Sequence, residues 1–192
     1  PEQKTYLKSR SVGYSESITM RAMVRPTTSR ERRAMVELKA VDTAYPLVGK
    51  METVPNSSGI NSYALQDGSW GASVDSNLLT RLQLKLGDRV KLGSITVQIR
   101  NTITIEPDRV ASVFSLGPRM MIHLDALRQS GLIQPGSQLR YHYKLIFSKA
   151  TNKEKWQSHL TKNFPKAGWR LRTPEEAAPG IKRFLERMTL FL

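Results

Sequence analysis

The alternation of apolar and polar residues most clearly predicts a β-strand at residues 34–41. Apolar side chains recur through this stretch, and Glu37 and Lys39 are interleaved among them. The pattern breaks at Asp42, and Pro46 follows, which lacks an amide proton and restricts the preceding residue to an extended conformation. We therefore expect a strand that leaves one packed unit here and turns into a second segment.

Further strands are predicted where apolar residues recur at every second position between turn residues. Residues 17–24 are expected to form a hairpin with residues 34–41 through the polar turn at 26–33, whose Arg30, Arg32 and Arg33 form a cationic tip. The strongest β pattern is a meander over residues 90–105. The remaining predicted strands cover residues 47–54, 120–122, 139–147 and 168–171.

Helices are predicted where apolar residues recur at a spacing of three or four. The clearest covers residues 74–86, with Asp75 or Ser76 as its N-cap and Gly87 as its end. Other helices are expected at residues 1–12, 124–129 and 151–164, and from Pro174 to the last residue. This order of elements is typical of an α+β fold.

The charge is unevenly distributed along the 192 residues, whose formal net charge is +14. Residues 1–40 carry nine Lys or Arg and four acids (+5), residues 138–192 carry twelve and four (+8), and residues 41–137 carry nine and eight (+1). We infer a basic α+β subdomain built from residues 1–45 and 138–192, with a β-rich subdomain inserted at 46–137. The basic surface is compatible with solubility, with anionic lipid headgroups or with nucleic acid.

Composition excludes several kinds of protein and site. The chain has no cysteine, and therefore neither a disulfide framework nor a thiolate metal site. No run of about 20 apolar residues is present to span a bilayer. Since the chain begins at Pro1 and ends within an apolar pattern, we expect it to be a segment of a longer protein that continues into membrane helices.

No residue pattern predicts catalysis. The three histidines, His123, His142 and His159, are scattered, and no Gly-x-Ser-x-Gly or Walker-type motif is present. Glu106 and Asp108 flank a proline and could share acid–base work, but a turn with an Asx-type hydrogen bond is the favoured interpretation. We expect no catalytic, cofactor or metal site, and a hydrolase with an unrecognised site is the weakest alternative.

Four short motifs carry a resemblance to a known family. They are Lys39–Gly49 (Lys-Ala-Val-Asp-x-x-Tyr-Pro-Leu-x-Gly), Leu86–Gly93, Glu106-Pro-Asp108, and Gly117–Ile122 followed by Ser130–Tyr141. In this order they resemble the extracytoplasmic domain of FtsX/MacB-type ABC transporter permeases, nearest the branch associated with a thioesterase/lysophospholipase. The motif residues, expected to be structural, are Lys39, Asp42, Tyr45, Pro46, Gly87, Asp88, Pro118, Arg119, Pro135 and Gly136.

The resemblance implies a fold like the periplasmic core of MacB and a position at the periplasmic face of the bacterial inner membrane. It implies a non-catalytic domain that transmits ATP-driven motion to the export or extraction of a lipid-like or hydrophobic substrate, or to a periplasmic partner. The implied partners are the membrane helices of the same permease and, indirectly, a cytosolic ABC ATPase.

A candidate partner or lipid surface consists of three apolar residues in predicted loops. Trp70 lies between glycines, where packing over a turn is the favoured interpretation and an exposed binding element the alternative. Phe114 and Leu116 lie in a predicted loop at residues 109–116. If the three prove exposed and contiguous, they would form an apolar contact surface.

The alternative from another functional class is a soluble basic nucleic-acid-binding module. Its candidate platform is the predicted strand at 139–147, where Tyr141 and Tyr143 could stack on bases. Strand alternation places these tyrosines opposite Arg140 and Lys144, which suits a core strand better than a platform. We therefore expect no nucleic-acid partner.

Overall fold

The structure is a computed structural model, and it describes residues 2–56, 62–109 and 117–172. The chain divides into two compact units, residues 1–148 and 149–192, which are described separately. The helices are α1 (Glu2–Ser9), α2 (Ser76–Leu82), α3 (Leu124–Gln129) and α4 (Lys153–Asn163). The strands are β1 (Gly13–Pro26), β2 (Ala34–Val41), β3 (Glu52–Val54), β4 (Leu65–Gln66), β5 (Ser69–Val74), β6 (Arg89–Leu92), β7 (Ile95–Ile105), β8 (Arg119–His123) and β9 (Arg140–Ile146).

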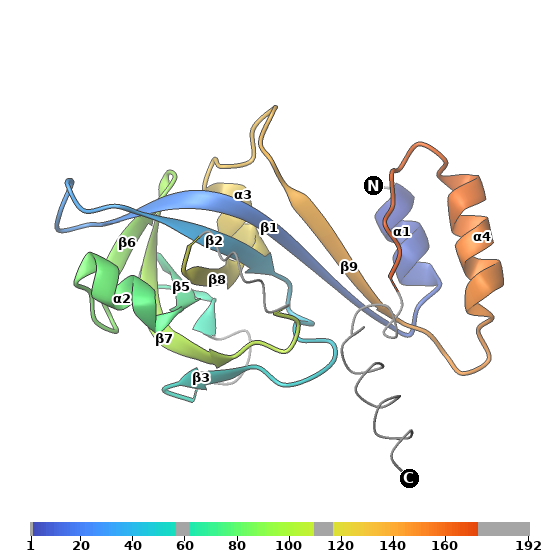
Figure 1. Cartoon of the computed structure of the whole chain (residues 1–192), viewed down its shortest axis with the longest axis horizontal. Coiled ribbons are helices and arrows are strands. Elements are labelled where there is room, and N and C mark those ends of the chain that lie inside the picture. The colour runs from blue at the N-terminus through green and yellow to red at the C-terminus, as the bar shows by residue number, and fades with distance from the viewer. Residues whose placement is uncertain (1, 57–61, 110–116, 173–192) are drawn as a thin grey trace, which may run out of the picture. The chain divides into compact units, whose positions relative to one another are not determined.

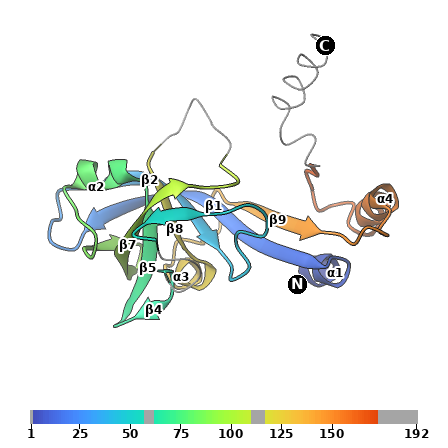
Figure 2. The same ribbon diagram turned by 90° about the horizontal axis from the view of Figure 1, so that it is seen from below.

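The first unit is built on one mixed sheet that closes on itself (Figures 1 and 2). Neighbouring strands run in the order β7, β6, β1, β2, β8 and β5, and β5 also pairs in parallel with β7. These strands therefore form a closed barrel, which leaves no edge among its own members. The remaining strands extend the wall: β3 pairs with β7, β4 with β5 and β9 with β1.

The predicted hairpin is confirmed and is the longest element of the barrel. β1 and β2 pair antiparallel from Ser17↔Val41 to Val24↔Ala34. Because side chains alternate along a strand, the even-numbered residues of β1 point inward, and Ile18, Ala22 and Val24 are buried. Arg21 and Met23, on the opposite face, are exposed. The pairing therefore has the register that the hydrophobic pattern requires.

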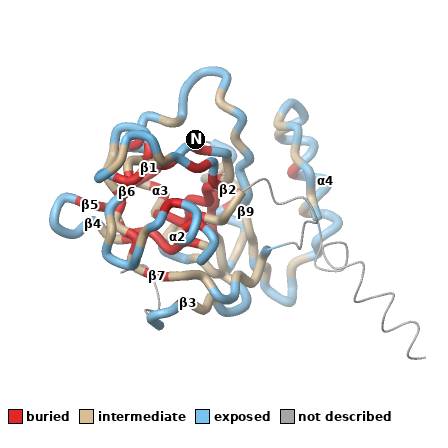
Figure 3. Tube along the Cα trace, turned by 60° about the vertical axis from the view of Figure 1, so that its left-hand side comes forward, coloured by how far each residue is buried: buried red, intermediate tan, exposed pale blue. Residues whose placement is uncertain are grey.

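The main hydrophobic core fills the barrel. It includes inward-facing residues such as Leu38, Val97 and Ile99, all at 0% exposure. The short helices α2 and α3 contribute Leu78, Leu82 and Leu127 to the same core, and Figure 3 traces the buried stretches through the strands. Each fully buried aliphatic side chain stabilises the fold by about 1.5–3 kcal/mol relative to exposure.

A second, smaller core lies on the outer face of β2 and β8. Val41 and Met121 are buried there, with Tyr63 over them and Tyr45 and Met51 packed alongside. Lys39 is registered against Met121 in the parallel β2–β8 pair, so both side chains leave the same, outer face of the wall. The segment after β2 therefore covers part of the outside of the barrel.

The caps of α2 agree with the sequence-based prediction at the N-terminal end but not at the C-terminal end. Asp75 is the N-cap of α2 and accepts a hydrogen bond from the Asn77 N–H at 3.0 Å, as predicted. The predicted end at Gly87 is wrong, because Gln83 adopts a left-handed conformation (φ 52°) and ends the helix there. Gly87 instead ends the following turn, with φ 92°.

Other predicted boundaries also differ. The N-terminal helix ends at Ser9, and Gly13 begins β1. The strand predicted at 47–54 is confined to Glu52–Val54. The strand predicted at 168–171 is not formed, because a strand needs a partner and the described part of the second unit contains no other strand.

The second unit contains α4, which was predicted at 151–164. Asn152 is its N-cap and accepts a hydrogen bond from the Lys155 N–H at 2.8 Å. Leu160 is buried, and Trp156 and Phe164 on the same face are partly buried, as the spacing predicted. The helix predicted from Pro174 lies outside the described residues.

Strands from both predicted subdomains share the sheet of the first unit. The first half of β1 pairs with β9, and its last residues pair with β6. The predicted division into a subdomain of both chain ends and an inserted part at 46–137 stays a prediction.

Candidate functional site

An ion-pair network lies on the outer face of β2 and centres on Lys39, whose side chain is 5% exposed. The Lys39 Nζ donates hydrogen bonds to Glu106 Oε1 at 2.9 Å, Asp108 Oδ1 at 2.7 Å and the Tyr45 hydroxyl at 3.0 Å. These partners match the three N–H donors of an ammonium group. No Lys39 donor is left over for a substrate in this arrangement.

Arg119, at the start of β8, supplies the second cation. Its Nε lies 3.0 Å from Glu106 Oε2, and its Nη1 lies 3.5 Å from Glu37 Oε2. The two oxygens of Glu106 are thus shared between Lys39 and Arg119, and its side chain is only 1% exposed. A carboxylate buried this deeply needs such partners, because desolvation of an unpaired charge costs several kcal/mol.

Asp108 links the network to β9. Its Oδ1 accepts hydrogen bonds from Lys39 and, at 2.6 Å, from the Tyr45 hydroxyl, and its Oδ2 lies 3.3 Å from the Lys144 Nζ. Burial by itself would raise the pKa of Asp108, but the charge of Lys39, the two hydrogen bonds and Lys144 outweigh it and lower the pKa to about 2. Asp108 is therefore ionised at neutral pH.

Tyr45 lies over the network. The Lys39 Nζ is 4.4 Å from the centre of its ring, a cation–π distance, and the ring also packs on the second core. Burial, followed by the hydrogen bond to Asp108 and the charges of Asp108 and Glu106, raises the pKa of Tyr45 well above its ordinary value. Tyr45 is thus a neutral donor at physiological pH.

Asp42 joins the same segment to β1. Its Oδ1 accepts from the Ser15 hydroxyl at 2.8 Å and from the Ala44 N–H at 3.1 Å. Its Oδ2 accepts from the Glu16 N–H at 2.6 Å. The break predicted at Asp42 is therefore a turn that this carboxylate stabilises with three hydrogen bonds.

The helix α1 is tied to the same place on β1. The Lys4 Nζ pairs with Glu16 Oε1, and the Glu16 side chain is 8% exposed. The rings of Tyr14 and Tyr143 lie 6.1 Å apart across the β1–β9 pair. Burial, with the charge of Glu16, raises the pKa of Tyr143 to about 12. A continuous set of polar contacts thus runs from α1 through Glu16 and Asp42 to the turn that carries Tyr45.

The remaining motif residues lie in turns. Asp88 Oδ2 accepts from the Lys85 N–H at 2.9 Å, and the Gly87 N–H donates to the Ile99 carbonyl at 2.7 Å. The Pro118 carbonyl accepts from the Glu37 N–H at 3.0 Å. Pro46 follows Tyr45 in the turn after β2, and Pro135 and Gly136 (φ 87°) form the turn before β9. The structural roles expected of these motif residues stay a prediction.

Trp70 is the only residue of the predicted apolar surface that lies within the described residues. It lies in β5 rather than over a turn, stacked on His123 with ring centres 5.9 Å apart, and its Nε1 donates to Gln129 Oε1 at 3.0 Å. Its ring is partly buried against the main core. Phe114 and Leu116 lie outside the described residues, so the three-residue surface stays a prediction.

The strand β9 is not the core strand that its apolar content suggested. None of its residues is buried, and Tyr141 is 47% exposed. Its described pairing is with β1 on one side, so it extends the wall instead of crossing the core. Its cations do lie opposite its tyrosines, but Lys4 of α1 lies 6.0 Å from the Tyr141 ring centre. The nucleic-acid alternative stays a prediction.

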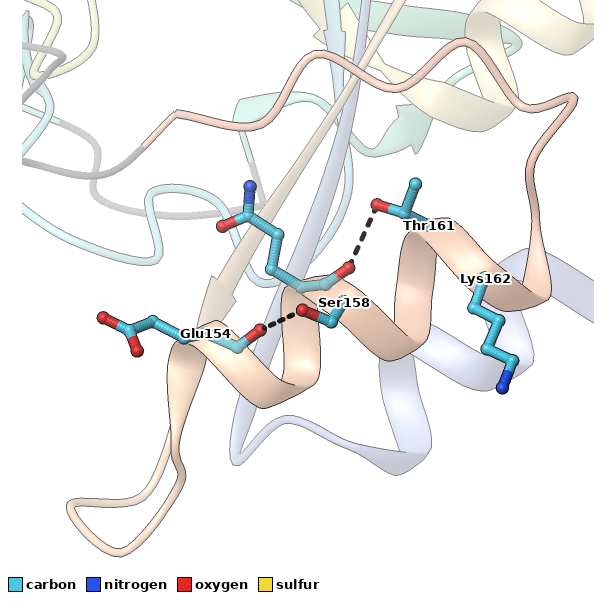
Figure 4. Close-up of a pocket in the computed structure, with 5 residues that line it drawn as sticks. Glu154, Ser158, Thr161 and Lys162 are labelled. Carbon is cyan, nitrogen blue, oxygen red and sulfur yellow. Dashed lines mark hydrogen bonds between the residues drawn. The ribbon is translucent and has the colours of Figure 1, made fainter.

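Two further observations bear on chemistry. Within the described ranges, no group of three or more acidic, histidine or cysteine side chains is arranged to hold a metal ion. A surface hollow lies along α4 (Figure 4), where the Ser158 and Thr161 hydroxyls donate to the carbonyls of Glu154 and Gln157 at 3.0 and 3.1 Å. Those hydroxyls are engaged by the helix backbone, which is common on exposed helix faces.

Comparison with known proteins adds to this geometry. No protein-family model matches the chain. Over 162 residues, 82% of its length, the chain is 31% identical to an uncharacterised ABC transporter permease, YbbP, of Escherichia coli K12. The aligned part is 18% of that permease.

Two solved structures share the fold. The periplasmic region of MacB from Actinobacillus actinomycetemcomitans superposes with a TM-score of 0.60 and 11% identity, covering 96% of this chain and 81% of that one. The extracellular domain of the transporter YknZ from Gram-positive bacteria has a TM-score of 0.55 and 14% identity, covering 85% and 83%.

The predicted resemblance to the extracytoplasmic domains of ABC transporter permeases is confirmed. The α+β fold of this chain is likewise that of the MacB and YknZ domains. None of its helices within residues 2–56, 62–109 and 117–172 has the length and apolarity needed to cross a bilayer.

The Lys39 network generates a first prediction, about stability. Replacing Lys39 with Met should lower the free energy of unfolding by about 3–5 kcal/mol, because Glu106 and Asp108 keep their burial but lose a shared partner. The matched control is Lys50→Met, whose partner Glu52 lies at 3.2 Å but whose side chain is 80% exposed. That control should cost at most about 1 kcal/mol. Urea unfolding measures both, and equal losses would contradict the role of the network.

Asp108 generates a second prediction, about acid stability. Because its folded pKa lies near 2, below its ordinary 3.8, its ionised form stabilises the fold above pH 4, and this contribution is lost as pH falls from about 4 to about 2. The loss should be about 2 kcal/mol, since each pKa unit corresponds to about 1.4 kcal/mol.

Urea unfolding across this pH range should show a weaker acid dependence in Asp108→Asn than in the wild type. The control Asp125→Asn, at a half-exposed carboxylate, should keep the wild-type dependence. An unchanged slope in Asp108→Asn would refute the assignment.

Proposed function

We propose that this chain is the extracytoplasmic domain of a bacterial ABC transporter permease, placed on the periplasmic face of the inner membrane. The observation that carries the proposal is the 31% identity to an ABC transporter permease over 82% of the chain. The fold shared with the MacB and YknZ domains supports the same position. The chain matches less than a fifth of its curated relative, so its task is proposed as part of a larger protein.

Its proposed task is mechanical. Membrane helices of the same permease, moved by a cytosolic ABC ATPase, would displace the chain ends, and the domain would pass this motion to a lipid-like or hydrophobic cargo or to a periplasmic partner. The contacts from α1 through Glu16 and Asp42 to Tyr45 support this, because they connect the first helix to the outer face of the barrel. Close-packed protein interiors have low compressibility and transmit strain.

The domain is proposed to be non-catalytic. The strongest cluster of charged side chains, around Lys39, is internally paired: the Lys39 donors, both Glu106 oxygens and both Asp108 oxygens all have partners. A general acid or base must instead reach a substrate proton within about 3 Å. This arrangement supports a structural role for the cluster and agrees with the role that the family resemblance implies.

Topology in the membrane tests the proposed location. The chain contains no cysteine, so a single one is easily introduced into a full-length permease whose other cysteines have been replaced. Val48→Cys, at a position 61% exposed, should react with a membrane-impermeant maleimide when only the outer membrane is permeabilised. The matched control Val97→Cys, at 0% exposure, should react only after denaturation. Labelling of Val48→Cys only after lysis of the inner membrane would place the domain in the cytoplasm and refute the proposal.

A further inference from the structure

One part of the barrel wall combines exposed methionines with cations that have no ion-pair partner among the described residues. β1 pairs with β2 on one side and with β6 on the other, so side chains of the three strands share one outer face. Met23 lies directly opposite Met35, and they are 48% and 42% exposed. The basic methionine face, as we name this surface, consists of Arg21, Met23, Arg25, Met35, Arg89 and Lys91.

The register of this face places like charges side by side. Arg25 is paired with Lys91 across the β1–β6 ladder, where Cβ atoms are about 5 Å apart. Two cations directly opposite each other on a sheet destabilise it. Within the described part of the chain, neither side chain has an acidic partner within ion-pair distance. An anionic group that lies between the two would remove this repulsion.

The neighbouring residues show what else a ligand would meet. Arg21 and Arg25 flank Met23 at the two-residue spacing of a strand, so each lies about 6.8 Å from Met23 along β1. Glu37, which lies directly opposite Arg21 in the β1–β2 ladder, pairs with Arg119. A complementary ligand therefore carries two acidic groups on either side of an apolar one.

A protein segment fits this face better than a lipid surface does. Apolar insertion into a bilayer needs apolar residues at the most projecting point, but the turn between β1 and β2, at the end of the hairpin away from α1, is polar (Figure 1). The methionines lie in the strands below that turn. Methionine adapts to varied apolar partners, and arginine is enriched where proteins bind one another.

We propose that the basic methionine face binds an extended segment of a partner protein in which two acidic residues flank an apolar one at two-residue spacing. The two acidic residues of the partner segment lie over Arg21 and over the Arg25–Lys91 pair, where opposite charges attract. The apolar residue packs on Met23 and Met35. This inference concerns the outer wall of the barrel and does not depend on the proposed place of the chain in a permease.

The probe is a labelled peptide, Ser-Glu-Ser-Leu-Ser-Glu-Ser, which in an extended conformation presents Glu, Leu and Glu on one face. Titrated into the isotope-labelled 192-residue chain, it should shift the amide resonances of β1, β2 and β6 most strongly in NMR spectra. Replacing its Leu by Ser should weaken binding about fivefold. Replacing both Glu by Gln should weaken it about tenfold.

Two charge-matched variants separate a specific face from general attraction to a basic chain. Arg25→Glu with Lys91→Glu should weaken peptide binding about tenfold. Lys149→Glu with Lys153→Glu makes the same change in net charge at exposed positions of the second unit, and should keep the affinity of the wild type. Thermal unfolding checks that both fold, and Arg25→Gln with Lys91→Gln replaces the first variant if it does not.

The proposal is overturned if the two variants weaken binding equally, or if no peptide-dependent shifts appear on the face at low salt. It is also overturned if the chain binds vesicles of phosphatidylcholine and phosphatidylglycerol through Arg25 and Lys91 but does not bind the peptide. That last outcome would assign the face to a lipid surface.

Discussion

Much of the first unit depends on how the charge of Lys39 is neutralised. The side chain leaves the outer face of β2, yet it is buried because Tyr45 after β2 and the distant Glu106 and Asp108 after β7 contact it. Arg119 at the start of β8 in turn pairs with Glu106. Removing charges from water is costly unless each has partners with good geometry. This requirement fixes where the segments that follow β2 and β7 lie against the barrel.

The network also explains how the two faces of the wall differ. Inside, aliphatic residues pack as the alternation of the strands requires. Outside, the surface changes along β2 from exposed Met35, through Glu37 paired with Arg119, to buried Lys39 and Val41. The outer face of β2 is thus exposed to solvent at the hairpin end and covered at the other end. At that covered end, Asp42 and Glu16 connect β2 to α1.

The sequence predicted most of the elements because they depend on local periodicity. The hairpin, the meander of β6 and β7, the strand β8 with α3, and the N-cap Asp75 all follow from spacing and capping chemistry. The closure of the barrel was not predictable in the same way, because the parallel β5–β7 and β2–β8 pairs join strands far apart in sequence. The exposure of β9 was missed because its apolar side chains extend the wall without entering the core.

For the site, the family motifs contain Lys39, Tyr45, Arg119, Glu106 and Asp108, but the two carboxylates were interpreted as part of a turn and not as partners of Lys39. The available signal was the lone charge of Lys39 in the otherwise apolar run from Leu38 to Val41, since a buried lysine requires acidic partners. Which acids supply them depends on tertiary structure. Lys144 could not be linked to Asp108 from spacing alone.

The proposed mechanical role requires that motion of α1 reaches the outer face of the barrel through Glu16 and Asp42. Hydrogen exchange of the full permease with its ATPase, with and without ATP, tests this most directly. ATP should change amide protection in α1, in the first half of β1 and in the turn after Asp42, and Asp42→Ala should confine the change to α1. Protection in these segments that does not respond to ATP would contradict the account.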